Sequence, residues 1–189
     1  MPRMVQKRFV TANQVVRDSF MLARMILDSG FRPDVLLVLW RGGTPVGIAV
    51  HEFLHYQGIH TWHTAIKAES YTGIGKRREP VINDLSPVLA NVKRNSRVLV
   101  VDDIFDTGCT VKKVKDCLMA KTCHVRIATL YYKKSHNLTD LGPDYFVRET
   151  SEWIVFPHEL MGLTKPEILL KDRFLHRLLS RRPGGRRGK

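Results

Sequence analysis

The sequence predicts an α/β protein with a largely parallel central sheet flanked by helices. Two continuous apolar runs, at 34–40 and 97–101, are typical of buried strands, and each leads through a glycine-containing turn into a helical pattern. Strand and helix patterns also alternate along the rest of the chain, which indicates parallel strands joined by helices. The chain has 189 residues, of which 43% are hydrophobic, so it suits one domain with a full core.

The first predicted helix covers residues 11–29. Thr11 is a suitable N-cap, and Gly30 directly follows the end of the pattern. The apolar residues in between recur at helical spacing and predict one buried stripe, made of Val16, Phe20, Ala23 and Leu27.

A second helix follows the glycines of "RGGTP", with Thr44 as its N-cap and Pro45 in its first position. The remaining elements are predicted from apolar runs and turn residues. They are strands at 34–40, 59–66, 97–101, 124–132 and 144–147, a helix at 110–120, a short apolar segment at 152–159 and a last helix from Pro166.

Two segments are too polar for a core. Residues 67–80 are charged and carry glycines, which predicts a long mobile loop. The net charge of +13 is uneven, because residues 171–189 alone carry +7 and end in "SRRPGGRRGK". We therefore expect one domain over 1–175 and a basic, disordered tail over 176–189. Any binding of nucleic acid is expected only through this tail.

The composition also limits where the protein works. No stretch approaches the ~20 apolar residues that a membrane span needs, and "MPRMVQKRFV" lacks the apolar run of a secretory signal. Cys109, Cys117 and Cys123 form no pair of metal-binding motifs, and their odd number suits reduced thiols. We expect a cytoplasmic protein without a membrane partner.

The stretch "VLVVDDIFDTGCT", residues 98–110, carries the strongest chemical signal. Asp102 and Asp103 fall at the end of a buried strand, where open α/β sheets bind ligands. The next residues, 106–110, combine a glycine and two threonines before a helix N-terminus, which favours a phosphate group. Paired carboxylates beside a phosphate can accept hydrogen bonds from a sugar diol or hold Mg²⁺ through waters. The stretch therefore predicts a site for a phosphorylated sugar with a metal ion.

Receiver domains, Walker A loops and structural acidic turns fit this stretch less well. Receiver domains also follow a "VLVV" strand with two acids, but there the acids lie near the start of the domain, and "DTGCT" would have no role. A Walker A loop is excluded because the chain has no GK[ST] sequence. A purely structural acidic turn is disfavoured, because Asp102, Asp103 and Asp106 would repel one another.

The stretch resembles the signature with which type I phosphoribosyltransferases bind 5-phosphoribosyl-1-pyrophosphate (PRPP). Further segments resemble the family in the same order along the chain: "VLWRGGTP" its pyrophosphate loop and "KAESYTG" its flexible catalytic loop. "LYYKKS" and "EWIVFPHE" resemble the base-recognition segments of its 6-oxopurine branch, the hypoxanthine, guanine and xanthine enzymes. The resemblance covers 38–159 and implies the fold of this family, with a small hood over the base formed from 1–33 and 148–165.

The resemblance implies a PRPP site with three parts. Asp102 and Asp103 would bind the ribose hydroxyls, and Asp106 would act as the acid/base near purine N7. The 5′-phosphate would lie on Asp106, Thr107, Gly108, Cys109 and Thr110, and pyrophosphate on Arg41, Gly42 and Gly43. Mg²⁺ would be held by Asp102, Asp103 and Glu159, through waters. A cis peptide bond is expected at Trp40–Arg41 or Arg41–Gly42.

The resemblance also implies how the base and the loop act. Lys133, or its neighbour Lys134, would donate to the oxygen at purine position 6, and Ser70 and Tyr71 would cover the phosphates. The remaining base contacts would be Trp153 by stacking, the backbone of Ile154, and Glu159 near position 2. At Val155 some xanthine-guanine enzymes carry a glutamate, so the choice among hypoxanthine, guanine and xanthine stays open.

The predicted function is purine salvage: transfer of 5-phosphoribosyl from PRPP to a 6-oxopurine, with release of pyrophosphate. The family also implies a homodimer or homotetramer. One alternative is a regulator of the same fold that senses PRPP and binds nucleic acid, which the basic tail supports and the base-recognition segments oppose. Another is a pyrimidine or adenine substrate, against which Lys133 and "WIVFP" argue.

Overall fold

The main sheet has five parallel strands and one antiparallel strand at its edge. The computed structural model describes residues 7–69, 72–73, 76–77, 81–82 and 84–180. The strands lie in the order β6-β3-β2-β7-β8-β9, and only β6 runs antiparallel to its neighbour. Their bounds are β2 Val35–Trp40, β3 Trp62–Glu69, β6 Val81–Ile82, β7 Val98–Phe105, β8 Val125–Tyr132 and β9 Tyr145–Glu149. The predicted α/β fold class is confirmed.

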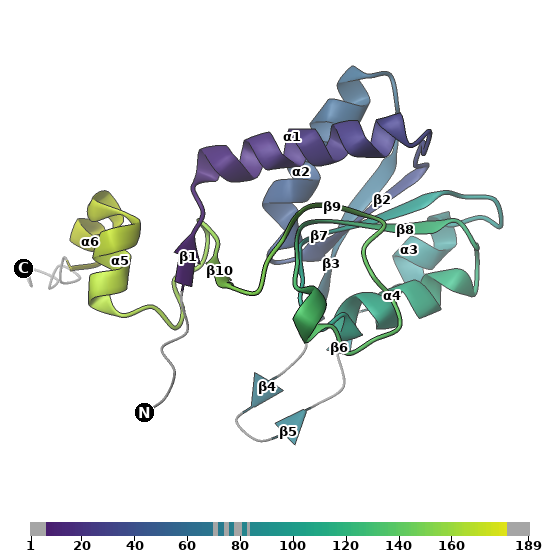
Figure 1. Cartoon of the computed structure of the whole chain (residues 1–189). Coiled ribbons are helices and arrows are strands. Elements are labelled where there is room, and N and C mark those ends of the chain that lie inside the picture. Colours follow the sequence, from purple (N-terminus) through teal and green to yellow (C-terminus); the bar gives the residue numbers. More distant parts are fainter. Residues whose placement is uncertain (1–6, 70–71, 74–75, 78–80, 83, 181–189) are drawn as a thin grey trace, which may run out of the picture.

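Helices cover both faces of this sheet (Figure 1). The helices α1 (Ala12–Asp28) and α2 (Gly43–Tyr56) pack with Leu36 and Val38 of β2, whereas Leu37 and Leu39 pack on the other face. That face is covered by α3 (Ser86–Asn91) and α4 (Cys109–Met119). A central strand buried on both faces needs apolar residues at every position, which explains the unbroken run in β2.

The apolar stripe predicted for α1 is wrong in two of its four residues. Val16 and Phe20 are exposed, although Ala23 and Leu27 are buried. The buried line instead contains the polar Asp18, which accepts two hydrogen bonds from Arg148 of β9. Periodicity alone missed this line, because the pattern treats an aspartate as a surface residue.

The start of α2 also differs from the prediction. The helix begins at Gly43 with Gly42 in the capping position, so Thr44 lies inside its first turn and is not the N-cap. The close approach of these glycines to β7, described below, fixes where the helix begins.

The segment predicted as a loop over 67–80 begins as strand and has short strands in its described part. β3 continues to Glu69, and the two-residue strands β4 (Thr72–Gly73) and β5 (Lys76–Arg77) pair antiparallel. β6 returns the chain to the edge of β3. Ser70 and Tyr71 lie outside the described residues.

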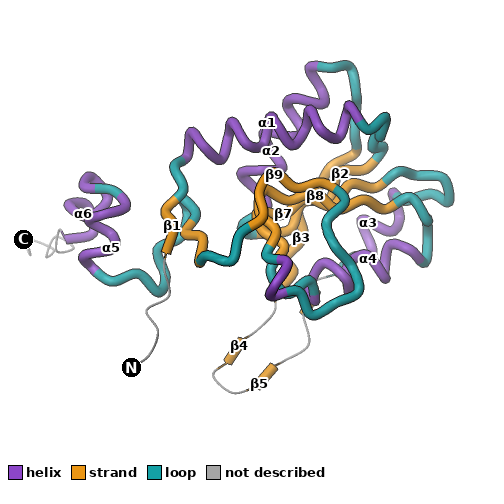
Figure 2. The backbone as a smooth tube through the Cα atoms, in the orientation of Figure 1, coloured by secondary structure: helices purple, strands orange, loops and turns teal. Residues whose placement is uncertain are grey.

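A second, two-stranded sheet lies apart from the main one (Figure 2). It pairs β1 (Lys7–Phe9) in parallel with β10 (Trp153–Val155), which joins two segments of the predicted hood. The predicted hood covered residues 1–33 and therefore included α1. In the structure α1 packs along α2, β8 and β9 of the main domain.

The C-terminal region forms two short helices beyond the small sheet. α5 (Lys165–Lys171) and α6 (Arg173–Ser180) replace the single last helix of the prediction, because Asp172 between them is extended. α6 runs to Ser180, so the tail predicted from residue 176 begins inside a helix. None of the helices in the described part of the chain is long and apolar enough to cross a membrane.

Candidate active site

Two acids lie at the carboxyl end of the main sheet. Asp102 and Asp103 were expected just past strand β7, but the strand continues to Phe105 because β8 runs beside it as far as Tyr132. Asp103 is only 7% exposed, and its backbone N–H donates to Asp102 Oδ1 at 2.9 Å. The two carboxylates are thus fixed by the sheet itself.

The surroundings of both acids favour their neutral forms. Burial raises the pKa of Asp102 to about 7, against hydrogen bonds from Asp103 and the Gly43 backbone that lower it. The pKa of Asp103 is raised well above its usual value by burial first, then by the charges of Asp102 and Glu159. A buried acid pair of this kind is stable in its charged form only when a cation or several donors compensate it.

The glycines of "RGG" lie directly against these acids. A Cβ on Gly42 would clash with the Asp103 carboxylate, and one on Gly43 would lie 2.6 Å from the Val101 carbonyl oxygen. Only glycine permits this approach. The peptide bond between Trp40 and Arg41 is cis, one of the two positions predicted, and Arg41 is exposed at the start of this loop.

The predicted phosphate loop joins β7 to α4. Gly108 caps α4 with a φ of 78°, and Cys109 and Thr110 form the first helical turn, where backbone N–H groups lack intrahelical acceptors. A pocket of about 190 Å³ opens there. It is lined by Ala68, Asp102, Ile104, Phe105, Asp106, Thr107, Gly108, Thr110 and Val111.

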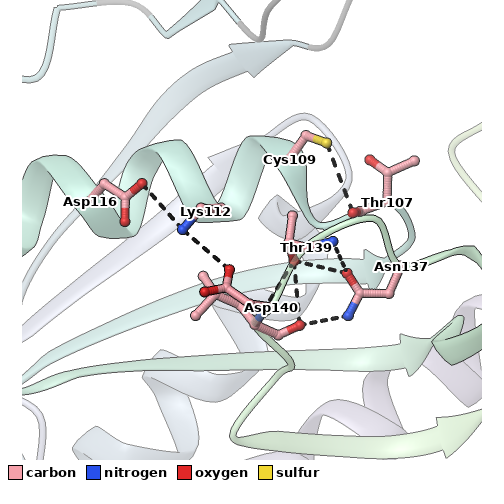
Figure 3. A network of polar contacts seen from close by, with 8 residues as sticks. Thr107, Cys109, Lys112, Asp116, Asn137, Thr139 and Asp140 are labelled. Carbon is pink, nitrogen blue, oxygen red and sulfur yellow. Dashed lines mark hydrogen bonds and ion pairs between the residues drawn. The ribbon is translucent and has the colours of Figure 1, made fainter.

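A polar network supports this loop from behind (Figure 3). Asn137 Oδ1 accepts hydrogen bonds from the N–H of Thr139 at 2.9 Å and from its hydroxyl at 2.8 Å. That hydroxyl lies against Gly108, where an added Cβ would come within 2.7 Å of Thr139 Oγ1. Lys112 of α4 pairs with Asp140 at 3.3 Å, which ties the same turn to the helix. The turn at 137–140 therefore packs against the phosphate loop and is joined to the helix that follows it.

Asp106 lies between two nitrogen-bearing side chains. Its Oδ2 is 3.1 Å from Lys133 Nζ, and its Oδ1 is 3.1 Å from His136 Nδ1. The Lys133 side chain is 5% exposed and its ammonium lies 5.3 Å from the ring centroid of Trp153. Lys134 is exposed in the 3₁₀ turn that follows, Lys134–His136, so Lys133 is the lysine that faces this site.

Glu159 lies in a turn that follows β10. Its carboxylate accepts a hydrogen bond from the Phe156 N–H at 3.0 Å, and its charge raises the pKa of Asp103. Lys171 of α5 donates to the carbonyls of both Phe156 and Glu159. Ile154 is buried in β10, with its backbone opposite Arg8 of β1.

The acids could hold a divalent cation only with outside help. No three His, Cys, Asp or Glu side chains come together as a metal site in the described part of the chain. However, burial raises the pKa values of Asp102 and Asp103, so a cation beside these carboxylates would favour their charged forms. Mg²⁺ commonly takes one or two carboxylates and completes its shell with waters and phosphate oxygens, which fits this pair.

The structure brings most of the predicted site residues to one edge of the sheet. The acids, the glycine loop, the phosphate loop, Lys133 and Glu159 come from four separate stretches of sequence. Sequence reasoning missed His136, Asn137 and Lys171. His136 had one usable signal, since it lies three residues after Lys133 and a 3₁₀ turn returns such a residue to the same side.

Comparisons with known proteins agree with this geometry. The model of the phosphoribosyl transferase domain matches residues 7–161. A hypoxanthine-guanine phosphoribosyltransferase of Lactococcus lactis is 28% identical over 143 residues, which are 75% of each chain. The crystal structure of a purine phosphoribosyltransferase from Pyrococcus horikoshii is 30% identical, with a TM-score of 0.66 over 84% of this chain and 97% of that one. A xanthine-guanine-hypoxanthine phosphoribosyltransferase of Helicobacter pylori, 23% identical with a TM-score of 0.60 over 79% of this chain and 92% of that one, shares the fold.

Proposed function

Since this chain belongs to the phosphoribosyl transferase family, we propose that it is a purine salvage enzyme. It transfers the 5-phosphoribosyl group of PRPP to a 6-oxopurine, which yields the nucleoside 5′-monophosphate and pyrophosphate. The relatives from Lactococcus and Pyrococcus, which are named for purine substrates, support this choice of base.

The observation that carries the proposal is the buried ammonium of Lys133. It lies 3.1 Å from Asp106 and over the ring of Trp153, at the open edge of the sheet. An ammonium group only donates hydrogen bonds, so it selects a base with an oxygen at position 6 and disfavours the amino group of adenine. Trp153 is half exposed beside this ammonium, so its ring offers an aromatic surface on which a flat base can stack.

The residues of the chain divide the reaction among them. The amides and hydroxyls of 106–110 hold the 5′-phosphate at the start of α4, while Asp102 and Asp103 hold the ribose. Arg41 and the amides of Gly42 and Gly43 hold the departing pyrophosphate. Asp106 accepts or shuttles the purine proton as the anomeric carbon passes through an oxocarbenium-like state.

Asp102, Asp103 and Glu159 would hold Mg²⁺ through waters, and the ion would neutralise the charge that develops on the leaving pyrophosphate. Residues 67–80, which include Ser70 and Tyr71 outside the described part of the chain, would cover the phosphates and exclude water, as the resemblance implies. We further expect a homodimer or homotetramer, and a cytoplasmic location in keeping with three cysteines that form no disulfide.

The test is pyrophosphate release from PRPP and Mg²⁺ with hypoxanthine, guanine, xanthine or adenine. We expect turnover with at least one 6-oxopurine and none with adenine. The variant Lys133→Met should lose this preference, whereas Lys113→Met on α4 is the matched control. Turnover with adenine equal to that with the 6-oxopurines would refute the assignment of the base.

The basic C-terminus favours one other function, a PRPP-sensing regulator that binds nucleic acid. In that case PRPP would bind without turnover of any base. Binding of RNA or DNA would then weaken steeply with salt and would be lost when residues 181–189 are removed.

A further inference from the structure

His136 is a second contact of the Asp106 carboxylate, besides Lys133. The two side chains take different oxygens: His136 Nδ1 lies 3.1 Å from Oδ1 and Lys133 Nζ lies 3.1 Å from Oδ2. In the tautomer with its proton on Nδ1, the imidazole donates to Asp106 Oδ1, because a carboxylate oxygen accepts. Asp106 is thereby held at both oxygens at once.

The backbone fixes His136 in this position. The Lys133 N–H donates to the Phe105 carbonyl at 2.9 Å, and the Leu138 N–H donates to the Thr107 carbonyl at 3.0 Å. These two bonds fasten the turn to the residues on either side of Asp106. Between them, the His136 N–H donates to the Lys133 carbonyl at 2.9 Å, which closes the turn and brings the imidazole over the carboxylate.

The two contacts cannot serve the same purpose during the proposed reaction. An ammonium has three N–H donors, so Lys133 can donate to the oxygen of the base and to Asp106 Oδ2 together. Its bond to Oδ2 must yield when this oxygen takes the proton of the purine nitrogen. A carboxylate held only at that oxygen would be free to rotate about its side-chain bonds when this bond yields.

We propose that His136 is a positioning residue that keeps Asp106 in its reactive orientation when the bond from Lys133 to Oδ2 yields. This inference rests on the proposed function, in which Asp106 is the acid/base and Lys133 contacts the base. Lys133 is then the exchangeable contact and His136 the permanent one, so that the carboxylate meets the purine at a fixed distance.

The test compares His136→Ala with His136→Asn, whose side-chain amide places a donor near the former Nδ1. We expect His136→Ala to lower kcat about tenfold, the value of one hydrogen bond to a charged group, with the KM for PRPP changed less than about twofold. His136→Asn should recover most of the loss. The control is His124→Ala, an exposed histidine just before β8, at the opposite end of that strand.

Three kinetic results would overturn the inference: an unchanged kcat in His136→Ala, a rise in the KM for PRPP in place of a fall in kcat, or no recovery in His136→Asn. A second measurement does not depend on turnover. The ring ¹⁵N resonances of His136 should shift in Asp106→Asn and stay in place in Asp116→Asn; unchanged resonances in Asp106→Asn overturn the contact itself. A wild-type protein without any turnover refutes the proposed function, and the positioning role falls with it.

Discussion

Two regions of this protein break the usual rule of burial in opposite ways. At the carboxyl edge of the main sheet, the acidic residue Asp103 is buried in the core, and burial raises the pKa of its neighbour Asp102 to about 7. In the C-terminal helices the apolar side chains of Leu170 and Phe174 are outside, 75% and 70% exposed. Neither α5 nor α6 contains a buried residue.

The difference lies in what holds each region in place. The two acids are fixed by β7, which carries them, and by Gly42 and Gly43, which pack against them, so their unfavourable burial is maintained by the sheet and α2. The helices are joined to the domain by few contacts, chiefly Lys7 with Glu167 and Lys171 with two carbonyls. The rest of the domain is stable enough to keep the two acids buried at a cost in free energy. The helices α5 and α6 are peripheral and contribute little to that stability.

The largest expected effect is that of Asp106→Asn at the edge site. An amide cannot accept the purine proton, so kcat should fall by about 100- to 10,000-fold while the thermal unfolding temperature changes little. Steady-state kinetics and a thermal melt measure both quantities. Asp116→Asn, on the exposed side of α4, is the control, and a similar loss there would show that the effect is not specific to the site.

A smaller effect is expected when the glycine loop is enlarged. Gly42→Ala places a methyl group on the Asp103 carboxylate, so the loop or the acid must shift, and kcat/KM for PRPP should fall about 100-fold. Gly142→Ala is the matched control, because its nearest neighbour, the Tyr132 hydroxyl, is at an ordinary 3.5 Å. If kcat/KM for PRPP falls equally in both variants, the close approach of Gly42 to Asp103 is not important for activity.

Removing one buried charge should stabilise the protein without ligand, and more so at high pH. The pKa of Asp103 is raised in the folded protein. At a pH below the ordinary pKa of an aspartate, Asp103 is protonated in the folded and the unfolded chain alike, so it has no effect on stability. As the pH rises, the unfolded chain releases the proton first, and stability is lost. Asp103→Asn should therefore raise the free energy of unfolding by about 1–2 kcal/mol at pH 8 and by almost nothing at pH 3. Denaturant melts without Mg²⁺ at both pH values measure this, and an equal gain at both would contradict it.

The smallest effect is expected at the other region. Deleting residues 173–189 removes α6, which buries no residue, and keeps Lys171 with its two carbonyl contacts. The thermal unfolding temperature should change by less than about 2–4 °C, the effect of roughly 1 kcal/mol in a domain of this size. A larger fall would mean that α6 supports the domain through contacts with another molecule.

The sequence allowed the edge site to be predicted better than the surface elements. The run from Val98 to Thr110 is contiguous, so its acids, glycine and helix start could be placed without knowing the fold. The strands were recognisable because a sheet covered on both faces demands unbroken apolar runs. Family membership and fold class are both confirmed.

The failures arise where tertiary contacts decide the local structure. Asp18 is buried in α1 because Arg148, 130 residues away, binds it, and no local pattern contains that information. The short helix α3 has only six residues, too few for a periodic signal. His136 was overlooked because a histidine in a polar turn is ordinary, and only the closeness of β7 and β8 brings it to Asp106.

The pairing of β1 with β10 has a consequence for how the protein is made. Lys7 pairs with Trp153 only after most of the chain exists, which at about 5–20 residues per second is a delay of roughly seven to thirty seconds during synthesis. Until then the first strand has an open edge, while the main sheet can already assemble behind it. The nascent chain thus carries an unpaired strand for much of its synthesis. A chain truncated before β10 would keep the unpaired backbone groups of β1 exposed.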